Sequence, residues 1–254
     1  MAALRFASLG SGSKGNATVV QGNGACLLVD CGFSVRETER RLGRLGLSAT
    51  DLDAILVTHE HTDHCSGVAR LSRRYSLPVY LTRGTWASGR INDVHEARFF
   101  ASEEEFQVGD CRVMPVAVPH DAREPCQFVL RAAGRTLGVL TDLGMITPFV
   151  AEHYGNCDAL LLECNHDGEM LRSGPYPPAL QRRVGGDWGH LNNMQAAGFL
   201  AGGLVGSLSH LVVAHISEKN NCRERVIEAL RTAGQDCTGI TWADQAGGFD
   251  WLEL

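Results

Sequence analysis

The sequence has 254 residues, of which 44% are hydrophobic and 20% charged, and its formal net charge is −6. These proportions are typical of a globular protein with a large core, and they exclude a low-complexity or collagen-like chain. The negative total charge also disfavours a protein that coats nucleic acid through a field spread over its whole surface.

No stretch approaches the run of about eighteen uncharged hydrophobic residues that a membrane-spanning helix needs. The first residues, MAALRFASLGSGSKGN, lack the basic and then hydrophobic layout of a signal peptide. We therefore expect a soluble, cytoplasmic protein. Nine cysteines occur singly, without a CxxC pair, which favours neither a disulfide framework nor a zinc knuckle. We expect these thiols to be reduced and mostly buried.

Short hydrophobic runs, each followed at once by polar residues, recur along the chain. In chain order they are CLLVDCG (26–32), LDAILVTHEHTDH (52–64), VMPVAVPHD (113–121), TLGVLTDLG (136–144), DALLLECNHD (158–167) and HLVVAHISEKNN (210–221). Their continuous hydrophobic character predicts buried strands that are covered on both faces. Because the polar residues follow strand ends, we expect them to meet at one edge of a sheet.

Helical segments separate these predicted strands. They are SVRETERRLGRLG (34–46), SGVARLSRRYS (66–76), NNMQAAGFLAGGL (192–204) and NCRERVIEALRTAG (221–234), with Asn221 or a neighbour expected to cap the last one. The final segment, GITWADQAGGFDWLEL (239–254), predicts a hairpin-like pair of strands. The order predicts an α/β fold with sheets layered between helices, in one domain over residues 1–254.

The densest polar cluster lies in VTHEHTDHCSG, which contains His59, His61, Asp63 and His64. Crowded imidazoles lose hydration and repel one another once protonated, so the cluster needs a partner. In an extended loop, the pattern His-x-His-x-Asp-His lets the first two imidazoles point at one position and the last two side chains at another. It therefore predicts a pair of divalent ions about 3.5–4 Å apart, a site that activates water and stabilises an attacked oxyanion.

Five motifs, in this order, resemble the metallo-β-lactamase superfamily: LVDCG, HEHTDH, VPHD, LTDLG and VVAHIS. The resemblance covers nearly the whole chain and implies an αββα sandwich. It also implies metal ligands, which are His59, His61 and His120 on one ion, Asp63, His64 and His215 on the second, and Asp142 as a bridge. Asp30 would orient a loop or a ligand imidazole from outside the ligand set.

Three further stretches narrow the resemblance to one branch of the superfamily. SLGSGSKGNATVV is similar to the opening of the YycJ (WalJ) branch, and HISEKNN is similar to the last motif of that branch. GHLNN (189–193) resembles the start of a histidine-containing helix in the tRNase Z nucleases. The resemblance implies a metal-dependent phosphodiesterase, most specifically a nuclease that digests DNA ends from 5′ to 3′.

Phosphodiester hydrolysis requires an activated water, donors for the phosphate oxygens and an acid for the leaving oxygen. We expect Asp63 to hold the attacking water in addition to a metal ion. Glu163 and His190 are similar in context to a proton relay of the related nucleases and would supply the acid.

Other polar residues are candidates for contacts with the substrate. Ser217, Asn220 and Asn221 are placed to hold a phosphate. The glycine-rich loop of residues 11–16, with Lys14, either cradles a second phosphate through its amides or is a plain turn. His166 follows Glu163 in the same loop and is a further ligand, a substrate contact or a capping residue.

The segment SGPYPPALQRRVGGDWG (173–189) has two interpretations. It is either an ordinary surface loop or a flexible flap over the site. In a flap, Tyr176 or Trp188 would stack on a base, and Arg182 and Arg183 would bind phosphates.

Departures from relatives bear on the substrate. The chain between Asp142 and His215 is too short for an inserted cap domain, so we expect none. The sequence has no Gly/Pro-rich arm and no arginine after the HIS motif, which weakens the hypothesis that the substrate is transfer RNA.

A small-molecule acyl hydrolase, acting on a lactam, thioester or lactone, remains the alternative function and would need an apolar cleft. A regulatory protein with vestigial metals is disfavoured by the complete ligand set. Zinc and manganese both suit the ligands, and the expected partner is a DNA end rather than a membrane.

Overall fold

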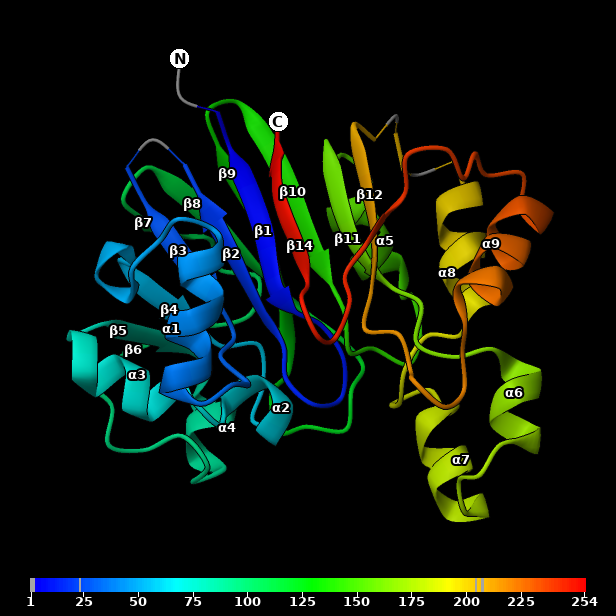
Figure 1. Cartoon of the computed structure of the whole chain (residues 1–254), viewed down its shortest axis with the longest axis horizontal. Helices are drawn as coiled ribbons and strands as arrows, with labels where there is room; N and C mark the ends of the chain where they lie inside the picture. The colour runs from blue at the N-terminus through cyan, green and yellow to red at the C-terminus, as the bar shows by residue number, and fades with distance from the viewer. Residues whose placement is uncertain (1–2, 23, 204, 207) are drawn as a thin grey trace.

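The structure is a computed structural model of the chain, and it describes residues 3–22, 24–203, 205–206 and 208–254. Within these residues, two seven-stranded sheets pack face to face, with helices on both outer sides (Figure 1). This arrangement is the αββα sandwich that the sequence predicts.

The first sheet has the strand order β14-β1-β2-β3-β4-β5-β6. Its strands are β1 (Arg5–Gly10), β2 (Ala17–Gln21), β3 (Cys26–Val29), β4 (Ala54–Leu56), β5 (Pro78–Leu81), β6 (Glu96–Phe99) and β14 (Phe249–Glu253). The pairings from β14 to β3 are antiparallel, and those from β3 to β6 are parallel.

The second sheet has the strand order β13-β12-β11-β10-β9-β8-β7. Its strands are β7 (Phe106–Val108), β8 (Cys111–Ala117), β9 (Cys126–Ala132), β10 (Arg135–Leu140), β11 (Ala159–Glu163), β12 (His210–Ala214) and β13 (Thr241–Trp242). Strands β7 to β10 pair in antiparallel fashion and β10 to β13 in parallel. Each sheet therefore has one antiparallel and one parallel half.

The helices divide between the two outer faces and the edge that carries the strand ends. They are α1 (Val35–Arg44), α2 (Thr62–Cys65), α3 (Val68–Tyr75), α4 (Arg83–Ala87), α5 (Pro148–Tyr154), α6 (Gly168–Ser173), α7 (Pro178–Val184), α8 (Asn193–Ala201) and α9 (Arg223–Thr232), with a 3₁₀ turn at Ala49–Asp51. Helices α1 and α3 cover the first sheet, α8 and α9 lie on the opposite side of the molecule, and α6 and α7 project together from one end (Figure 1).

Strand β3 shows why the strands are hydrophobic without alternation. Leu27 and Val29 pack between the two sheets, whereas Cys26 and Leu28 pack on the other face, toward the helices. A third hydrophobic layer lies between the second sheet and its helices, and includes Tyr154. Both faces of the central strands are thus buried, as the continuous hydrophobic runs predict. The nine cysteines are free thiols, and all but Cys222 and Cys237 are buried.

One local prediction is wrong. The last segment does not form a hairpin, because β13 pairs with β12 in the second sheet while β14 pairs with β1 in the first. Trp242 packs beside the helix layer and Phe249 packs between the sheets, so the chain crosses from one sheet to the other. The N-cap position of α9 is Cys222, the neighbour of Asn221. The side-chain oxygen of Asn221 accepts from the amide of Cys222 at 2.9 Å, and its amide donates to the carbonyl of Cys164 at 2.8 Å.

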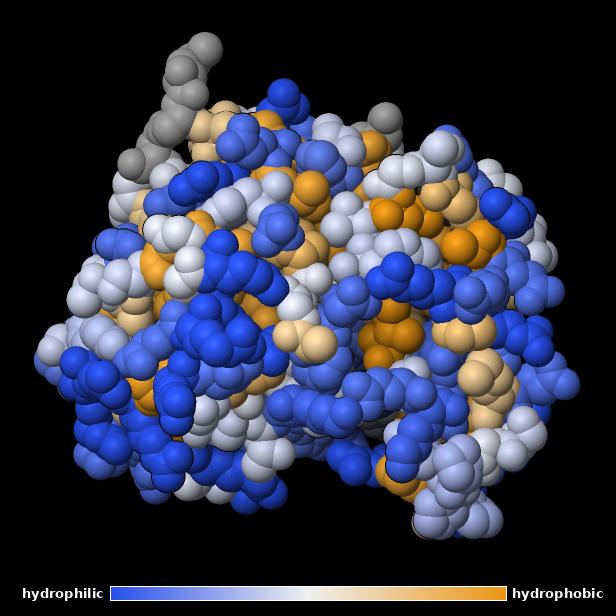
Figure 2. Space-filling model, viewed as in Figure 1, coloured by the Kyte–Doolittle hydropathy of each residue, from blue (hydrophilic) through white to orange (hydrophobic). Residues whose placement is uncertain are grey.

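The face of the molecule seen in Figure 2 is largely hydrophilic or neutral, with hydrophobic residues in small separate groups. Among the described residues, no helix combines the length and the hydrophobicity needed to cross a bilayer.

Arg41 of α1 fastens this helix to the first sheet. Its side chain is only 10% exposed and pairs with Glu37 at 2.6 Å. The guanidinium also donates to the backbone carbonyls of Leu9 and Gln245 and lies 4.1 Å above the ring of Phe33. A single side chain therefore satisfies acceptors at the ends of two neighbouring strands.

Substitution Arg41→Met should lower the free energy of unfolding by about 2–3 kcal/mol, because buried carbonyls lose their charged donor. Arg40→Met is the matched control, since Arg40 is 66% exposed and also pairs with Glu37; its effect should stay below about 1 kcal/mol. Urea denaturation of both variants measures the difference. Equal losses in the two variants would contradict the anchoring role of Arg41.

Candidate metal centre

The polar residues that follow the strands meet at one edge of the sandwich. Asp30 follows β3, the segment from Thr58 to Cys65 follows β4, and Asp142 and His215 follow β10 and β12. Asp30, Asp142 and His215 have positive φ angles of 61°, 55° and 51°. Such left-handed backbone is uncommon outside glycine and costs on the order of 1 kcal/mol for each residue, and it is concentrated at functional sites.

The first group of possible ligands comprises His59, His61 and His120, whose ligand nitrogens lie within 4.8 Å of one another. His61 Nδ1 and His120 Nε2 are 3.2 Å apart. His120 Nδ1 donates to the carbonyl of Gly189 at 3.0 Å, which leaves its Nε2 without a proton. The three imidazoles can therefore present lone pairs to one position.

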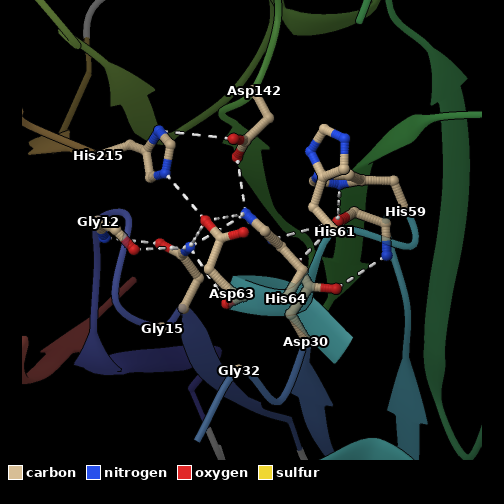
Figure 3. Close-up of polar contacts among 12 residues, drawn as sticks. Gly12, Gly15, Asp30, Gly32, His59, His61, Asp63, His64, Asp142 and His215 are labelled. Atoms are coloured by element: carbon tan, nitrogen blue, oxygen red, sulfur yellow. Dashed lines mark hydrogen bonds and ion pairs between the residues drawn. The ribbon is translucent and has the colours of Figure 1, made fainter. Parts of the chain in front are cut away.

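The second group comprises Asp63, His64 and His215. Asp63 Oδ2 lies 3.5 Å from His64 Nε2 and 3.8 Å from His215 Nε2. Asp142 Oδ2 lies 3.3 Å from His64 Nε2, and Asp142 also forms a ligand group with His59 and His64. Figure 3 shows the side chains of Asp63, His64, Asp142 and His215 turned toward one another. Asp142 thus lies between the two groups, where a bridging ligand would stand.

Asp30 orients the imidazoles of His64 and His59 through hydrogen bonds at their Nδ1 atoms. Its carboxylate accepts a hydrogen bond from His64 Nδ1 at 2.8 Å and one from the hydroxyl of Thr58, also at 2.8 Å. Because the hydroxyl of Thr58 donates to Asp30, it accepts from His59 Nδ1, at 2.9 Å. Both imidazoles consequently carry a proton on Nδ1, and Nε2 is the nitrogen that each directs toward the site.

Glu163 orients the imidazoles of His215 and His190 by hydrogen bonds, as Asp30 orients that of His64. One carboxylate oxygen lies 2.7 Å from His215 Nδ1 and 2.9 Å from His190 Nδ1, and the other accepts from the backbone amide of Leu191 at 2.9 Å. Glu163 is fully buried. Burial favours its neutral form, but the two imidazoles outweigh this effect and lower the pKa of Glu163 to about 2. The carboxylate is therefore charged at neutral pH.

Charges in the cluster also set the protonation state of the possible ligands. Burial opposes a charged imidazole, but Asp142 and Asp30 outweigh it and raise the pKa of His64 well above its usual range. Burial lowers the pKa of His120 to about 4. Burial likewise opposes the charge of Asp142, but His215 and His64 hold its pKa well below the usual range. A cation that replaces the protons of His64 and His215 would keep this balance.

Buried polar atoms test whether metal ions fit this arrangement. His59 Nε2, Asp142 Oδ2 and His215 Nε2 are buried and have no hydrogen-bond partner in the described part of the chain. Unpaired buried polar atoms are costly, so three of them facing one space require an explanation. Imidazole nitrogens and carboxylate oxygens are ligands of zinc and related divalent ions. The residues present therefore fit divalent metal ions.

A family model described as the beta-lactamase superfamily domain matches residues 26–216. The chain belongs to the β-lactamase superfamily. It is 37% identical over 225 residues to the exodeoxyribonuclease YycJ of Bacillus anthracis, which covers 87% of this chain and 85% of the relative. It is 33% identical over 228 residues to the exodeoxyribonuclease WalJ of Streptococcus pneumoniae, covering 87% and 84%. The predicted YycJ-like branch is confirmed.

Solved structures of this superfamily share the fold at lower identity. The metallo-β-lactamase fold protein YhfI from Bacillus subtilis aligns with a TM-score of 0.74 and 17% identity, covering 99% of this chain and 100% of that chain. Zn²⁺-bound PqqB from Methylobacterium extorquens aligns with a TM-score of 0.72 and 19% identity, covering 98% and 100%. These two structures show the αββα fold. The family match, the two exodeoxyribonuclease relatives and the groups of possible ligands show a metal-dependent hydrolase whose site binds divalent metal ions.

A hollow of about 330 Å³ opens above the predicted metal ligands. Ser217, a predicted substrate contact, and His190, a predicted catalytic residue, both line it. Arg90 also lines it, and sequence reasoning missed this residue because the loop between α4 and β6 carries no motif. Asn16 was considered only as part of a loop, but its amide contacts Asp63 Oδ2 at 3.3 Å and His64 Nε2 at 3.0 Å.

Several predicted substrate contacts lie elsewhere. Asn220 and Asn221 are buried and do not line the hollow over the metal ligands. The amide of Asn221 is used by Cys164 and Asn193, which explains its inward orientation. Lys14 Nζ pairs with Glu218 at 2.6 Å, at the surface. His166 is 2% exposed and lines a different hollow, so the structure does not bring it to the metal ligands.

Two predicted loops have more structure than expected. In the loop of residues 11–16, the amides of Ser11, Gly12, Lys14, Gly15 and Asn16 all donate to acceptors within the protein. A phosphate cradle built from these amides is therefore wrong, and the turn interpretation holds. Segment 173–189 contains helix α7, so it is not an irregular loop; Tyr176 and Arg183 line the hollow, whereas Trp188 is 64% exposed.

Gly32 leaves room for the chain that carries Asp63. A β-carbon at Gly32 would lie 1.8 Å from the carbonyl oxygen of Asp63 and 2.8 Å from the amide of Asn16. No side chain fits there unless the Asp63 backbone moves. The glycine of the LVDCG motif is thus required by close approach of two backbones.

Gly32→Ala should displace Asp63 and lower the amount of metal retained after dialysis, because the second ligand group loses its geometry. Gly43→Ala is the matched control, since nothing lies within 4 Å of the added carbon in α1 and alanine favours a helix. Elemental analysis of both purified variants measures the retained metal. Wild-type metal content in Gly32→Ala would contradict this role.

Proposed function

We propose that this protein is a nuclease that uses two divalent ions, zinc or manganese, and that it acts as a 5′-to-3′ exonuclease on DNA ends. The proposal includes one domain over residues 1–254 without an inserted cap, located in the cytoplasm with its DNA. The names of the relatives YycJ and WalJ support the reaction. The observation that carries it is the position of His190, which Glu163 holds beside the ligand groups and which lines the same hollow.

The lining of the hollow supports a phosphate-containing substrate. Arg90 and Arg183 lie on it, from the N-terminal and C-terminal halves of the chain. Arg183 pairs with Asp121, while the guanidinium of Arg90 has no ion pair among the described residues. Guanidinium groups bind phosphate oxygens in pairs of hydrogen bonds. The acyl hydrolase alternative needs an apolar cleft, whereas this hollow is lined by arginine, histidine and aspartate side chains.

Divalent ions held by these ligands would activate water and stabilise the negative charge that develops on the phosphate. The residues of the chain supply the rest. Asp63 is partly exposed to the hollow and can hold the attacking water. His190 donates from Nδ1 to Glu163, so its Nε2 is the atom that can carry a proton to the leaving oxygen. The charged Glu163 stabilises that protonated imidazole.

Digestion of 5′-phosphorylated duplex DNA, labelled at either end, tests the proposal directly. With added manganese or zinc, the wild-type protein should release nucleotides progressively from the 5′ end. Asp63→Ala should be inactive because it removes a predicted ligand, whereas Asp250→Ala should retain full activity because Asp250 is 84% exposed, on β14, and does not line the hollow. If the metal-loaded wild-type protein leaves both DNA and RNA intact, the nuclease proposal fails.

The role of His190 can be separated from metal binding. His190→Ala should lower kcat on DNA by roughly 10²–10⁴, with wild-type metal content. Bis(4-nitrophenyl) phosphate has a good leaving group that needs little protonation, so its hydrolysis should fall much less. An equal loss on both substrates, or metal loss as large as in Asp63→Ala, would contradict a proton donor at this position.

A further inference from the structure

A second hollow of about 560 Å³ lies behind helix α7. Its walls come from the segment between His166 and Arg172, from the end of α7, and from Asn192 at the start of α8. Figure 1 shows α6 and α7 side by side at this end of the molecule. Its volume is in the range of ligand pockets, and it is separate from the hollow above the metal ligands.

His166 is the buried polar group of this hollow. Its side chain is 2% exposed, and its Nδ1 has no hydrogen-bond partner within the described ranges of the chain. Its other nitrogen faces Gly185, where a β-carbon would lie only 3.8 Å away. Gly185 lines the same hollow, so the imidazole is directed into a space that a side chain at this position would fill.

Two arginines face the same hollow without acidic partners. Arg172 and Arg182 line it, and neither guanidinium forms an ion pair with any described residue. The nearby acids are already engaged, because Asp167 caps α6 and Glu169 pairs with Arg225. In a chain of net charge −6, two unpaired arginines beside a buried imidazole favour an anionic ligand.

Helix α7 joins the two hollows. Arg183 and Val184 face the hollow above the metal ligands, whereas Gln181 and Arg182 face the second one. The helix therefore forms a common wall. A chain of phosphates whose reacting group lies at the metal ligands can continue over α7 into the second hollow.

We propose that the second hollow is a subsite for an unpaired nucleotide of the substrate strand, away from the reacting phosphate. This inference rests on the proposed nuclease function. Arg172 and Arg182 bind the phosphate, and Leu171 packs against the face of the base. His166, the side-chain oxygen of Gln181 and the amide nitrogen of Asn192 contact its edge, since the amide nitrogen of Gln181 and the oxygen of Asn192 are used within the protein. The mixture of charged, amide and hydrophobic groups suits a nucleotide better than a bare anion.

The test compares substrates of different length. The substrates are single-stranded DNA of two to eight nucleotides, and for the wild-type protein KM should fall as the strand becomes longer. Arg182→Ala should raise KM about tenfold on the longer strands, with kcat unchanged. In this variant KM should no longer fall with strand length. Bis(4-nitrophenyl) phosphate has a single phosphodiester and cannot reach the second hollow, so its hydrolysis should be unchanged. Arg231→Ala is the control, since Arg231 is another exposed arginine, on α9.

A second variant, His166→Phe, keeps the ring but removes its polar nitrogens, and should also raise KM on long strands alone. Unchanged KM in Arg182→Ala, or equal loss on long strands and on bis(4-nitrophenyl) phosphate, would overturn the subsite while leaving the nuclease function intact. Failure of the metal-loaded wild-type protein to hydrolyse either substrate would overturn both proposals.

Discussion

Two buried carboxylates determine how the metal centre is built. Asp30 and Glu163 lie beneath the ligand groups, and each accepts from the Nδ1 of a ligand histidine, His64 and His215 respectively. A buried carboxylate is tolerated only where donors surround it. The same hydrogen bonds hold a proton on each Nδ1 and direct each Nε2 toward the position of a metal ion. The hydrogen bonds that make the burial of these acids tolerable are therefore the same ones that orient the imidazoles.

The fold places these carboxylates by repeating one plan. In each sheet an antiparallel half leads into a parallel half, and the parallel strands all end at the edge where the ligands lie. Asp30 follows the first parallel strand of one sheet, and Asp142 follows the corresponding strand of the other. Both have left-handed backbone. This strain turns the chain sharply at the strand end, and the three hydrophobic layers stabilise it.

The sequence predicts this part well because it depends on local patterns. Continuous hydrophobic runs identify buried strands, and polar residues directly after them identify the edge. The structure brings all seven predicted ligands together, although their roles as ligands stay predictions. The failures depend on distant contacts. In the loop at residues 11–16, the amides of Ser11 and Lys14 are used by Asp244 and Gln245, near the other end of the sequence. Asn221 is turned inward by Asn193. No local pattern reveals which acceptor an amide will reach.

The acidic net charge and the proposed substrate are compatible because unpaired arginines line the two hollows beside α7. Most arginines on this protein pair with an acid, as Arg98 does with Glu96, so they add little to the field that a distant phosphate meets. Arg90, Arg172 and Arg182 have no such partner among the described residues, and all three line one of the two hollows beside α7. A strand end that enters these hollows would meet the unpaired guanidinium groups at short range, where salt screens little, so local attraction can act against the net negative charge of the chain.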